Sequence, residues 1–331
     1  MNEASLSYVL GIDIGGTNLV VGAVRDDGGQ VVAAASRPTN PKRGPDAVID
    51  EIIAMGRETL SALAAEVPGS TVIGMGIGSP GPLDTRRGVV LLTPNLGWVE
   101  MPVRDRLAGG LDLPAHLDND ANCAILGECW VGAGRGARCV VGLTIGTGIG
   151  GGIVIDGRLH HGVADCAGEI GHMTINVNGR RCGCGNDGCL EAYASGPAIA
   201  ARAVEQLRAG ASSRLTSLVD GDIDRVTAAT VYEAAAAGDL FADEVVRDTA
   251  RYLGVGVANL LNIFNPDRVV IAGGVTRAGD HLFEPLRREV ARRAFRPAVD
   301  SCTIVPAALG DHAGVIGAAR VFLDHQVSGA S

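Results

Sequence analysis

The sequence has no excess of positive charge: 28 lysine and arginine residues stand against 37 aspartate and glutamate residues, and the formal net charge is −9. A broad basic surface for nucleic acid or for an anionic membrane is therefore not expected. The first residues include Glu3 and lack the positive segment and apolar core of a secretory signal. The uncharged stretch 139–155 is too short and too rich in glycine for a membrane helix. We therefore expect a cytoplasmic protein without a nucleic-acid or membrane partner.

Two further absences concern the organisation of the chain. The 48 glycines show no triplet period, and no proline-rich or serine-rich linker interrupts the sequence. The first absence excludes a collagen, and the second favours domains joined by structured crossings. A length of 331 residues is more than one hydrophobic core usually serves, and a hydrophobic content of 47% can fill two cores. We expect two domains that hinge around a cleft.

Hydrophobic periodicity predicts an α/β protein whose second half repeats the plan of the first. Strands at 8–14, 19–25 and 30–36 form an antiparallel opening sheet, and a long helix follows from Pro45. After an irregular stretch at 79–100 the pattern starts again, although residue identity between the halves is too low to prove a repeat. Further strands are expected at 71–78, 115–117, 139–145, 152–155, 268–272 and 303–306, and further helices at 102–108, from 121, at 198–208, 228–237, 242–263, 278–294 and from 312.

The segment Gly11–Asn18, with the sequence GIDIGGTN, is a strand that runs into a tight turn. Such a turn directs backbone N–H groups and the hydroxyl of Thr17 toward phosphate oxygens. Asp13, just before the turn, can hold Mg²⁺ through water. The alternative is an ordinary glycine hairpin in which Asp13 accepts hydrogen bonds from nearby N–H groups.

The segment 144–152, with the sequence TIGTGIGGG, contains a formal G-x-G-x-x-G match at Gly146, Gly148 and Gly151. A dinucleotide-binding fold needs a helix directly after these glycines, whereas residues 153–157 are typical of a strand and a turn. A second phosphate hairpin fits better. If the first hairpin binds the phosphates of a nucleotide, this second hairpin could bind the same nucleotide from the other domain.

His172 is followed by Cys182, Cys184 and Cys189 in an H-x₉-C-x-C-x₄-C pattern. Three thiolates and one imidazole fill a tetrahedral zinc and leave no position for a hydrolytic water, so the zinc would be structural. A chance cluster and a nucleic-acid zinc module are the alternatives, and the acidic composition opposes the second. The other five cysteines show no ligand spacing and are interpreted as small buried residues.

Three carboxylates are candidates for proton transfer or for binding hydroxyl groups. Asp120, within the sequence DNDAN at 118–122, is expected where a strand ends and a helix begins, so it could accept a proton or simply cap the helix. Glu169 and Glu191 flank the zinc ligands, and ligation of their neighbours would fix them for hydrogen bonds to vicinal hydroxyls. Taken singly, either glutamate could also be a solvated surface acid.

Together these residues resemble the ROK family of sugar kinases (repressors, open reading frames and kinases), in particular its bacterial glucokinases. The most specific segments are GEIGH at 168–172, CGCG at 182–185 and GCLE at 188–191, and the resemblance covers nearly the whole chain. It implies a two-lobed α/β fold like that of the actin-like and hexokinase-like (ribonuclease H-like) ATPases, with a central cleft and a structural zinc loop. The first lobe would comprise residues 1–118 with 312–331, and the second residues 119–311.

The resemblance also implies roles for individual residues. Asp120 matches the catalytic base, and His172 would give one ring nitrogen to zinc and the other to the sugar. The stretch TPNLGW at 93–98 resembles one common in glucose-using members. Asn18 stands where many members have Lys, and Asp165–Cys166 replaces small residues. The sugar ligands would be Gly81, Asn95, Asn119, Asp120, Glu169, His172 and Glu191. The nucleotide would contact Asp13, Gly15, Gly16, Thr17, Asn18, Gly146, Thr147, Gly148, Gly150, Gly273 and Gly274.

The expected activity is phosphorylation of glucose at its 6-hydroxyl by Mg-ATP, with Asp120 as general base and Zn²⁺ in a structural role. Another hexose (fructose, mannose, allose or an N-acetylhexosamine) and polyphosphate as the donor stay open. A sugar-sensing repressor is the rival from another class, but the first strand is expected to begin by Tyr8, which leaves no room for a helix-turn-helix. The family also implies a homodimer or a homotetramer.

Overall fold

The computed structural model describes residues 6–93 and 95–328. The chain divides into two compact units. The first unit comprises Met1–Gly136, Gly152–Ala167 and Ala308–Ser331, and the second comprises Ala137–Gly151 and Gly168–Ala307. The lobe boundaries expected from the sequence, with a change at residue 119, stay a prediction.

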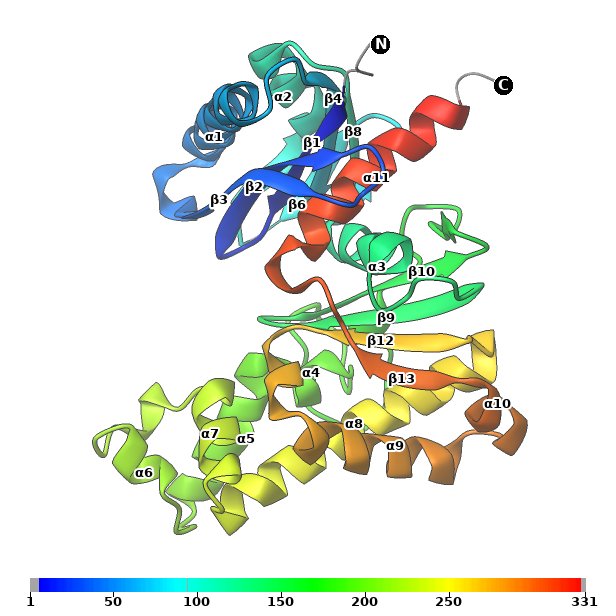
Figure 1. Cartoon of the computed structure of the whole chain (residues 1–331). Coiled ribbons are helices and arrows are strands. Elements are labelled where there is room, and N and C mark those ends of the chain that lie inside the picture. The colour runs from blue at the N-terminus through cyan, green and yellow to red at the C-terminus, as the bar shows by residue number, and fades with distance from the viewer. Residues whose placement is uncertain (1–5, 94, 329–331) are drawn as a thin grey trace. The chain divides into compact units, whose positions relative to one another are not determined.

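The first unit is built on a five-stranded sheet with the order β3-β2-β1-β4-β8 (Figure 1). Strands β1, β2 and β3 are antiparallel, as the sequence predicted, whereas β1, β4 and β8 are parallel. Parallel strands need crossover connections, and helices supply them here. The strands span Ser7–Ile14 (β1), Asn18–Arg25 (β2), Val31–Pro38 (β3), Thr71–Ser79 (β4) and Ala115–Asn119 (β8), and the helices span Pro45–Glu66 (α1), Val103–Leu111 (α2), Asp120–Val131 (α3) and Ala313–Ser328 (α11).

Both faces of this sheet are covered by helices. Successive side chains of β1 point to opposite sides, so its apolar residues pack on both faces. Leu10 and Ile12 pack into a core with α1 and α2, while Val9 packs against α11 on the other face (Figure 1). Helix α11 approaches the strand backbone closely at two glycines. A Cβ atom on Gly11 would lie 2.2 Å from the carbonyl oxygen of Val315, and one on Gly76 would also clash with α11. The sheet therefore accepts α11 only because these strand positions lack side chains.

The stretch 79–100, expected to be irregular, contains most of a three-stranded sheet with the order β5-β6-β7. The strands are Leu83–Asp84, Val89–Thr93 and Trp98–Met101. Short strands between turn residues give too few alternations for a periodicity to be detected, which is why the expectation was wrong. The side chain of Trp98 is fully buried and anchors this small sheet to the core of the unit. Pro94, part of the stretch 93–98 quoted above, lies outside the described residues.

The second unit contains the parallel strands β9 (Cys139–Ile145), β12 (Arg268–Ala272) and β13 (Thr303–Pro306). Strand β10 (Ile149–Ile155) begins in this unit and runs into the first, where it pairs with β11 (Arg158–Leu159). The helices are α4 (Glu191–Ala194), α5 (Gly196–Arg208), α6 (Leu215–Leu218), α7 (Ala228–Ala236), α8 (Leu240–Phe264), α9 (Asp280–Arg293) and α10 (Arg296–Ser301), and 3₁₀ turns lie at Pro41–Arg43, Ile170–His172, Ile223–Arg225, Gly274–Ala278 and Gly310–His312.

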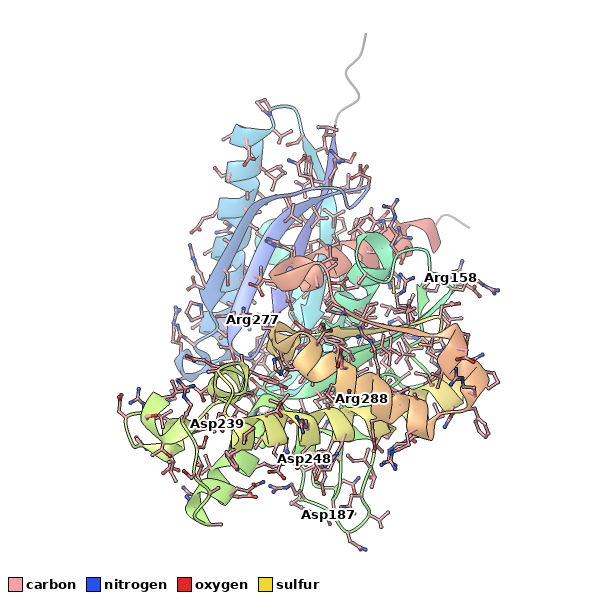
Figure 2. All side chains as sticks on the ribbon, turned by 60° about the horizontal axis from the view of Figure 1, so that its bottom comes forward. Arg158, Asp187, Asp239, Asp248, Arg277 and Arg288 are labelled. Carbon is pink, nitrogen blue, oxygen red and sulfur yellow. The ribbon has the colours of Figure 1, made fainter. Side chains whose placement is uncertain are left out.

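Helix α8 is the longest helix of the second unit and illustrates how the sequence sets helix ends. The Asp239 carboxylate (Figure 2) accepts a hydrogen bond of 2.8 Å from the N–H of Ala242 and so caps the first turn. Asn265 ends the helix in the left-handed conformation, which Asn tolerates better than most residues. Within the described ranges 6–93 and 95–328, no helix is both long and apolar enough to cross a membrane.

Candidate active site

The first phosphate hairpin is the turn between β1 and β2. The N–H of Gly15 donates to the carbonyl oxygen of Asn18 at 2.9 Å, and the Thr39 hydroxyl donates to the Gly15 carbonyl at 2.7 Å. These bonds fix the turn, while Gly16, Thr17 and Asn18 remain exposed at its tip. The backbone N–H groups and the hydroxyl at this tip are thus placed to meet a ligand of the size and charge of a phosphate.

Asp13 and Asp120 interact at the end of this hairpin. Burial, together with the nearby charge of Asp120, raises the pKa of Asp13 to about 7. A divalent cation bound here would favour the ionised form of Asp13 by offsetting the effects of burial and of the charge of Asp120. The arrangement fits the predicted Mg²⁺ role of Asp13.

Asp120 is the first residue of α3, but it is not the cap of that helix. Asn119 is the N-cap, and its Oδ1 accepts hydrogen bonds from the N–H groups of Ala121 at 2.9 Å and Asn122 at 3.1 Å. The capping role considered for Asp120 therefore belongs to Asn119, although one oxygen of Asp120 also accepts from Ala121 at 2.8 Å. The amide nitrogen of Asn119 lies toward Gly81, 3.8 Å from where a Cβ atom on that glycine would be.

A hydrogen-bonded pair, the buried Asp118 and the half-buried His161, stands directly before Asn119 and Asp120. Asp118 is 2% exposed, and its Oδ2 lies 2.7 Å from Nε2 of His161. This hydrogen bond raises the pKa of His161. His161 was not predicted as a site residue. The signal available in the sequence was the pair of consecutive histidines, His160 and His161, just after a hairpin.

The remaining predicted positions of the first unit are less enclosed. Asn95 is exposed in the turn between β6 and β7. Asp165, one of the departures from the family pattern, has a φ of 53°, a left-handed conformation that favours glycine and explains the small residues expected there. Its neighbour Cys166 is exposed, contrary to the interpretation of the isolated cysteines as buried, because it lies in a surface loop. Of the other four, Cys123 is fully buried as expected, whereas Cys129, Cys139 and Cys302 are only partly buried.

The second hairpin joins β9 to β10. The N–H of Gly146 donates to the Gly148 carbonyl at 2.9 Å, and Thr147 is exposed at the tip. A strand follows directly, so the G-x-G-x-x-G match is not a dinucleotide-binding turn. The Glu191 carboxylate accepts a hydrogen bond of 2.8 Å from the N–H of Ile149. A Cβ atom on Gly148 would lie 2.6 Å from this carboxylate, so the contact needs glycine there.

The four predicted zinc ligands converge in the second unit. The ligand atoms of His172, Cys182, Cys184 and Cys189 all lie within 4.8 Å of one another. The sulfurs of Cys184 and Cys189 are 3.7 Å apart, and Cys182 Sγ is 3.8 Å from His172 Nδ1. Zinc–sulfur bonds of about 2.3 Å at tetrahedral angles place two sulfurs about 3.8 Å apart, so the residues fit a closed zinc site.

The two candidate sugar glutamates lie beside this cluster. With Nδ1 of His172 directed at the sulfurs, its Nε2 lies 4.0 Å from an oxygen of Glu169, which is itself exposed. Glu191 is nearer to the ligands, because its second oxygen is 3.6 Å from Cys182 Sγ. Ligation of zinc through Nδ1 would leave Nε2 and both carboxylates available to a polyhydroxyl ligand.

A pocket of about 490 Å³ in the second unit lies next to Gly146 and Gly274. Gly273, where β12 ends, has a φ of 100°, and a Cβ atom there would lie 2.0 Å from the carbonyl oxygen of Ile145. The lining is mostly alanine and glycine, with Tyr232 and Arg277 (Figure 2) among its few polar residues. A mainly apolar recess beside two backbone turns suits the base and ribose of a nucleotide.

Each unit thus brings together part of the predicted set. Asp13, Asn119, Asp120 and Gly81 gather in the first unit, while the zinc ligands, both glutamates and the second hairpin gather in the second. The sequence pattern of the ROK family matches residues 9–325. The chain belongs to the ROK family.

Relatives within the family include both enzymes and regulators. A glucokinase of Halalkalibacterium halodurans is 41% identical over 314 residues, which cover 94% of this chain and 93% of the relative. A xylose repressor of Caldicellulosiruptor bescii is 36% identical over 257 residues, covering 78% of this chain and 64% of the repressor. Among solved structures, a ROK glucokinase from Streptomyces griseus in complex with glucose and AMPPNP has a TM-score of 0.81 and 35% identity, covering 95% of this chain and 98% of that one. The actin-like and hexokinase-like α/β fold of ROK sugar kinases is thereby confirmed.

Proposed function

We propose that this ROK protein is an ATP-dependent hexokinase that phosphorylates glucose at its 6-hydroxyl. The observation that carries the proposal is the interaction of Asp120 with Asp13, because it joins a candidate base to a candidate cation site beside a phosphate hairpin. The similarity to glucokinases over nearly the whole chain supports the choice of glucose.

In the proposed reaction the 6-hydroxyl oxygen attacks the γ-phosphorus of ATP in line, and the bond between that phosphorus and the bridging oxygen of ADP breaks. Asp120 orients the hydroxyl and accepts its proton. Mg²⁺, held through Asp13, would supply positive charge to the phosphate oxygens. Because the transition state of phosphoryl transfer is loose, positioning and the N–H groups of the hairpins contribute more than a strongly basic carboxylate.

Sugar recognition is assigned to groups that keep a free hydrogen-bonding edge. Asn119 uses Oδ1 on the helix backbone, so its amide nitrogen is the part offered to a hydroxyl. Glu169, Glu191 and Nε2 of His172 would accept from or donate to the remaining hydroxyls, with Gly81 and Asn95 as further contacts. Zinc bound by His172 and the three cysteines would have no open coordination position and would hold this loop rigid.

The nucleotide is assigned to the two hairpins and the pocket beside Gly273 and Gly274. Because the pocket offers an apolar recess that polyphosphate would leave empty, it supports ATP as the donor. The remaining phosphate contacts would come from Gly15–Asn18 and from Gly146, Thr147, Gly148 and Gly150.

A hexose panel in a coupled ADP-release assay tests the proposal. We expect glucose to give the highest kcat/KM, with fructose, mannose, allose and N-acetylhexosamines below it. A higher value for another hexose would correct the substrate and leave the kinase assignment in place. The kinase assignment would be contradicted if folded, zinc-loaded protein released no ADP with any of these sugars.

The similarity to xylose repressors favours one alternative, a non-catalytic sugar sensor. Such a protein would bind a sugar in calorimetry and release no ADP. The same assay therefore separates the two. The proposal includes the expected homodimer or homotetramer. The side chains of Ile263 and Phe295, 67% and 74% exposed, provide apolar surface for such an interface. Light scattering would measure the mass of the assembly.

A further inference from the structure

The loop of residues 160–167 follows β11 in the first unit and makes two polar links to distant parts of that unit. It is closed on itself by a hydrogen bond of 3.0 Å from the N–H of Ala167 to the carbonyl oxygen of His161. Its apex, Val163, is fully exposed. The two links tie this surface loop to segments that are distant in the sequence.

The first link joins the loop to the end of β8. Nε2 of His161 lies 2.7 Å from Oδ2 of Asp118, while Oδ1 of Asp118 accepts from the N–H of Asn119 at 2.7 Å and from the side chain of Asn122 at 3.0 Å. Asp118 is thus buried with each oxygen occupied. Because one of its partners is the backbone of Asn119, a shift of His161 is passed directly to the segment that carries Asn119 and Asp120.

The second link joins the loop to the turn after β5. Oδ2 of Asp165 accepts from the N–H of Thr85 at 3.1 Å and from the Thr85 hydroxyl at 2.9 Å. Asp165 keeps this position in the left-handed conformation, at a φ of 53°. Aspartate tolerates this conformation better than most residues, and the two hydrogen bonds to Thr85 fix its carboxylate. Thr85 lies four residues after Gly81.

We propose that the 160–167 loop positions the sugar acceptor, with His161 and Asp165 holding the Gly81 segment at a fixed distance from Asn119 and Asp120. Both residues are positioning residues and neither is assigned a contact with the sugar. The inference rests on the proposed function, because it takes these segments to be the sugar side of the first unit.

The charge of His161 contributes to both links. Its hydrogen bond to Asp118 raises its pKa, and the nearby charge of Asp165 raises it further, against the opposing effect of burial. Asp118 on β8 and Asp165 in the loop are the charged groups that face it. Protonation of the imidazole is therefore easier than in a free histidine, and as the pH rises through this raised pKa the attraction to both carboxylates is lost. We expect the KM for glucose to rise on this alkaline limb.

The test compares His161→Gln with His160→Gln. His160 is the adjacent exposed histidine; among the described residues only its backbone N–H makes a hydrogen bond, to the Ile153 carbonyl. We expect His161→Gln to raise the KM for glucose about tenfold, the effect of losing one hydrogen bond between charged groups, with kcat and the KM for ATP nearly unchanged. His160→Gln should match the wild type, and the alkaline rise in KM should vanish only in His161→Gln.

Asp165→Gly tests the second link while suiting the positive φ. It removes both acceptor oxygens, so it should also raise the KM for glucose and not kcat. If either variant fails to fold, Thr85→Val decides, because it removes a single hydroxyl; we expect a rise of about threefold. An unchanged KM for glucose in folded His161→Gln and Asp165→Gly overturns the inference. A fall in kcat and a rise in the KM for ATP as large as the rise in the KM for glucose would overturn it as well.

The outcome is separable from that of the proposed function. A wild type without sugar-dependent ADP release contradicts the proposed function itself. An active wild type with unaffected variants contradicts only the role of the loop. Calorimetric titration with glucose alone provides a second reading, in which His161→Gln should weaken binding by the same factor as it raises KM.

Discussion

Glu191 and Ile149 are joined by a hydrogen bond of 2.8 Å between a carboxylate oxygen and a backbone N–H. The other oxygen of Glu191 lies 3.6 Å from Cys182, a candidate zinc ligand. One side chain thus connects the zinc loop to the second phosphate hairpin within the second unit. Since the same glutamate is a proposed sugar ligand, the metal, the sugar contact and the hairpin depend on one another.

Removal of zinc should therefore affect more than stability. We expect about one zinc per chain in elemental analysis, and chelation should lower the Tm and raise the KM for both glucose and ATP. Cys184→Ser removes one ligand, so it should lower the Tm and raise both KM values in the same way. Cys123 lies outside the cluster, so Cys123→Ser should retain the metal. Full zinc content in Cys184→Ser would contradict the assignment.

Asp120→Asn tests the proposed base. The amide can still hydrogen-bond to the hydroxyl but cannot accept its proton, so kcat should fall by about 10²–10⁴-fold while glucose binding in calorimetry is retained. Asp50→Asn, an exposed acid on α1, serves as the matched control. Turnover near that of the wild type in Asp120→Asn would remove the role assigned to this residue.

The raised pKa of Asp13 predicts a dependence of stability on pH in the absence of Mg²⁺. Because its pKa is about 7 in the folded protein and about 3.9 in an unfolded chain, the folded state binds more protons between these values. Its contribution to stability therefore falls as the pH rises from about 4 to about 7. We expect the Tm of Asp13→Asn to exceed that of the wild type increasingly over this range, and Mg²⁺ to reduce the difference near neutral pH. Parallel Tm curves for the two proteins would show that Asp13 titrates normally.

Glu128 predicts a large effect on stability far from any proposed ligand. Its side chain is fully buried, and its carboxylate accepts hydrogen bonds from the N–H groups of Ala133 at 2.7 Å, Ala308 at 2.9 Å and Leu309 at 2.8 Å. An amide in place of the carboxylate would leave a buried N–H unpaired. Glu128→Gln should therefore lower the free energy of unfolding by about 2–3 kcal/mol. Denaturant titration measures this loss, and the exposed Glu66→Gln on α1 should show none of it.

Local patterns were enough to predict most of the fold and the metal cluster. The four candidate zinc ligands lie within residues 172–189, and both hairpins are marked by glycines next to buried strands, so short-range spacing carries the information. The pairing of the opening strands follows in the same way from alternation and turn residues.

Contacts between distant residues could not be predicted. His161 and Asp118 are 43 residues apart, and Asp165 and Thr85 are 80 apart. No pattern in either segment indicates its partner, because such pairs are set by the packing of the whole unit. Strands β5, β6 and β7 were missed for a related reason, since their pairing and the burial of Trp98 stabilise them more than their own alternation does.

Helix α11, which covers one face of the first sheet and contacts its strand glycines, is made after every residue of the second unit. On the ribosome the second unit is therefore complete before the first can bury Val9, Val24 and the other residues on that face. Strands β1 and β2 are synthesised before the second unit, but their packing partner α11 is synthesised after it. Until then the exposed apolar strands are a target for chaperones.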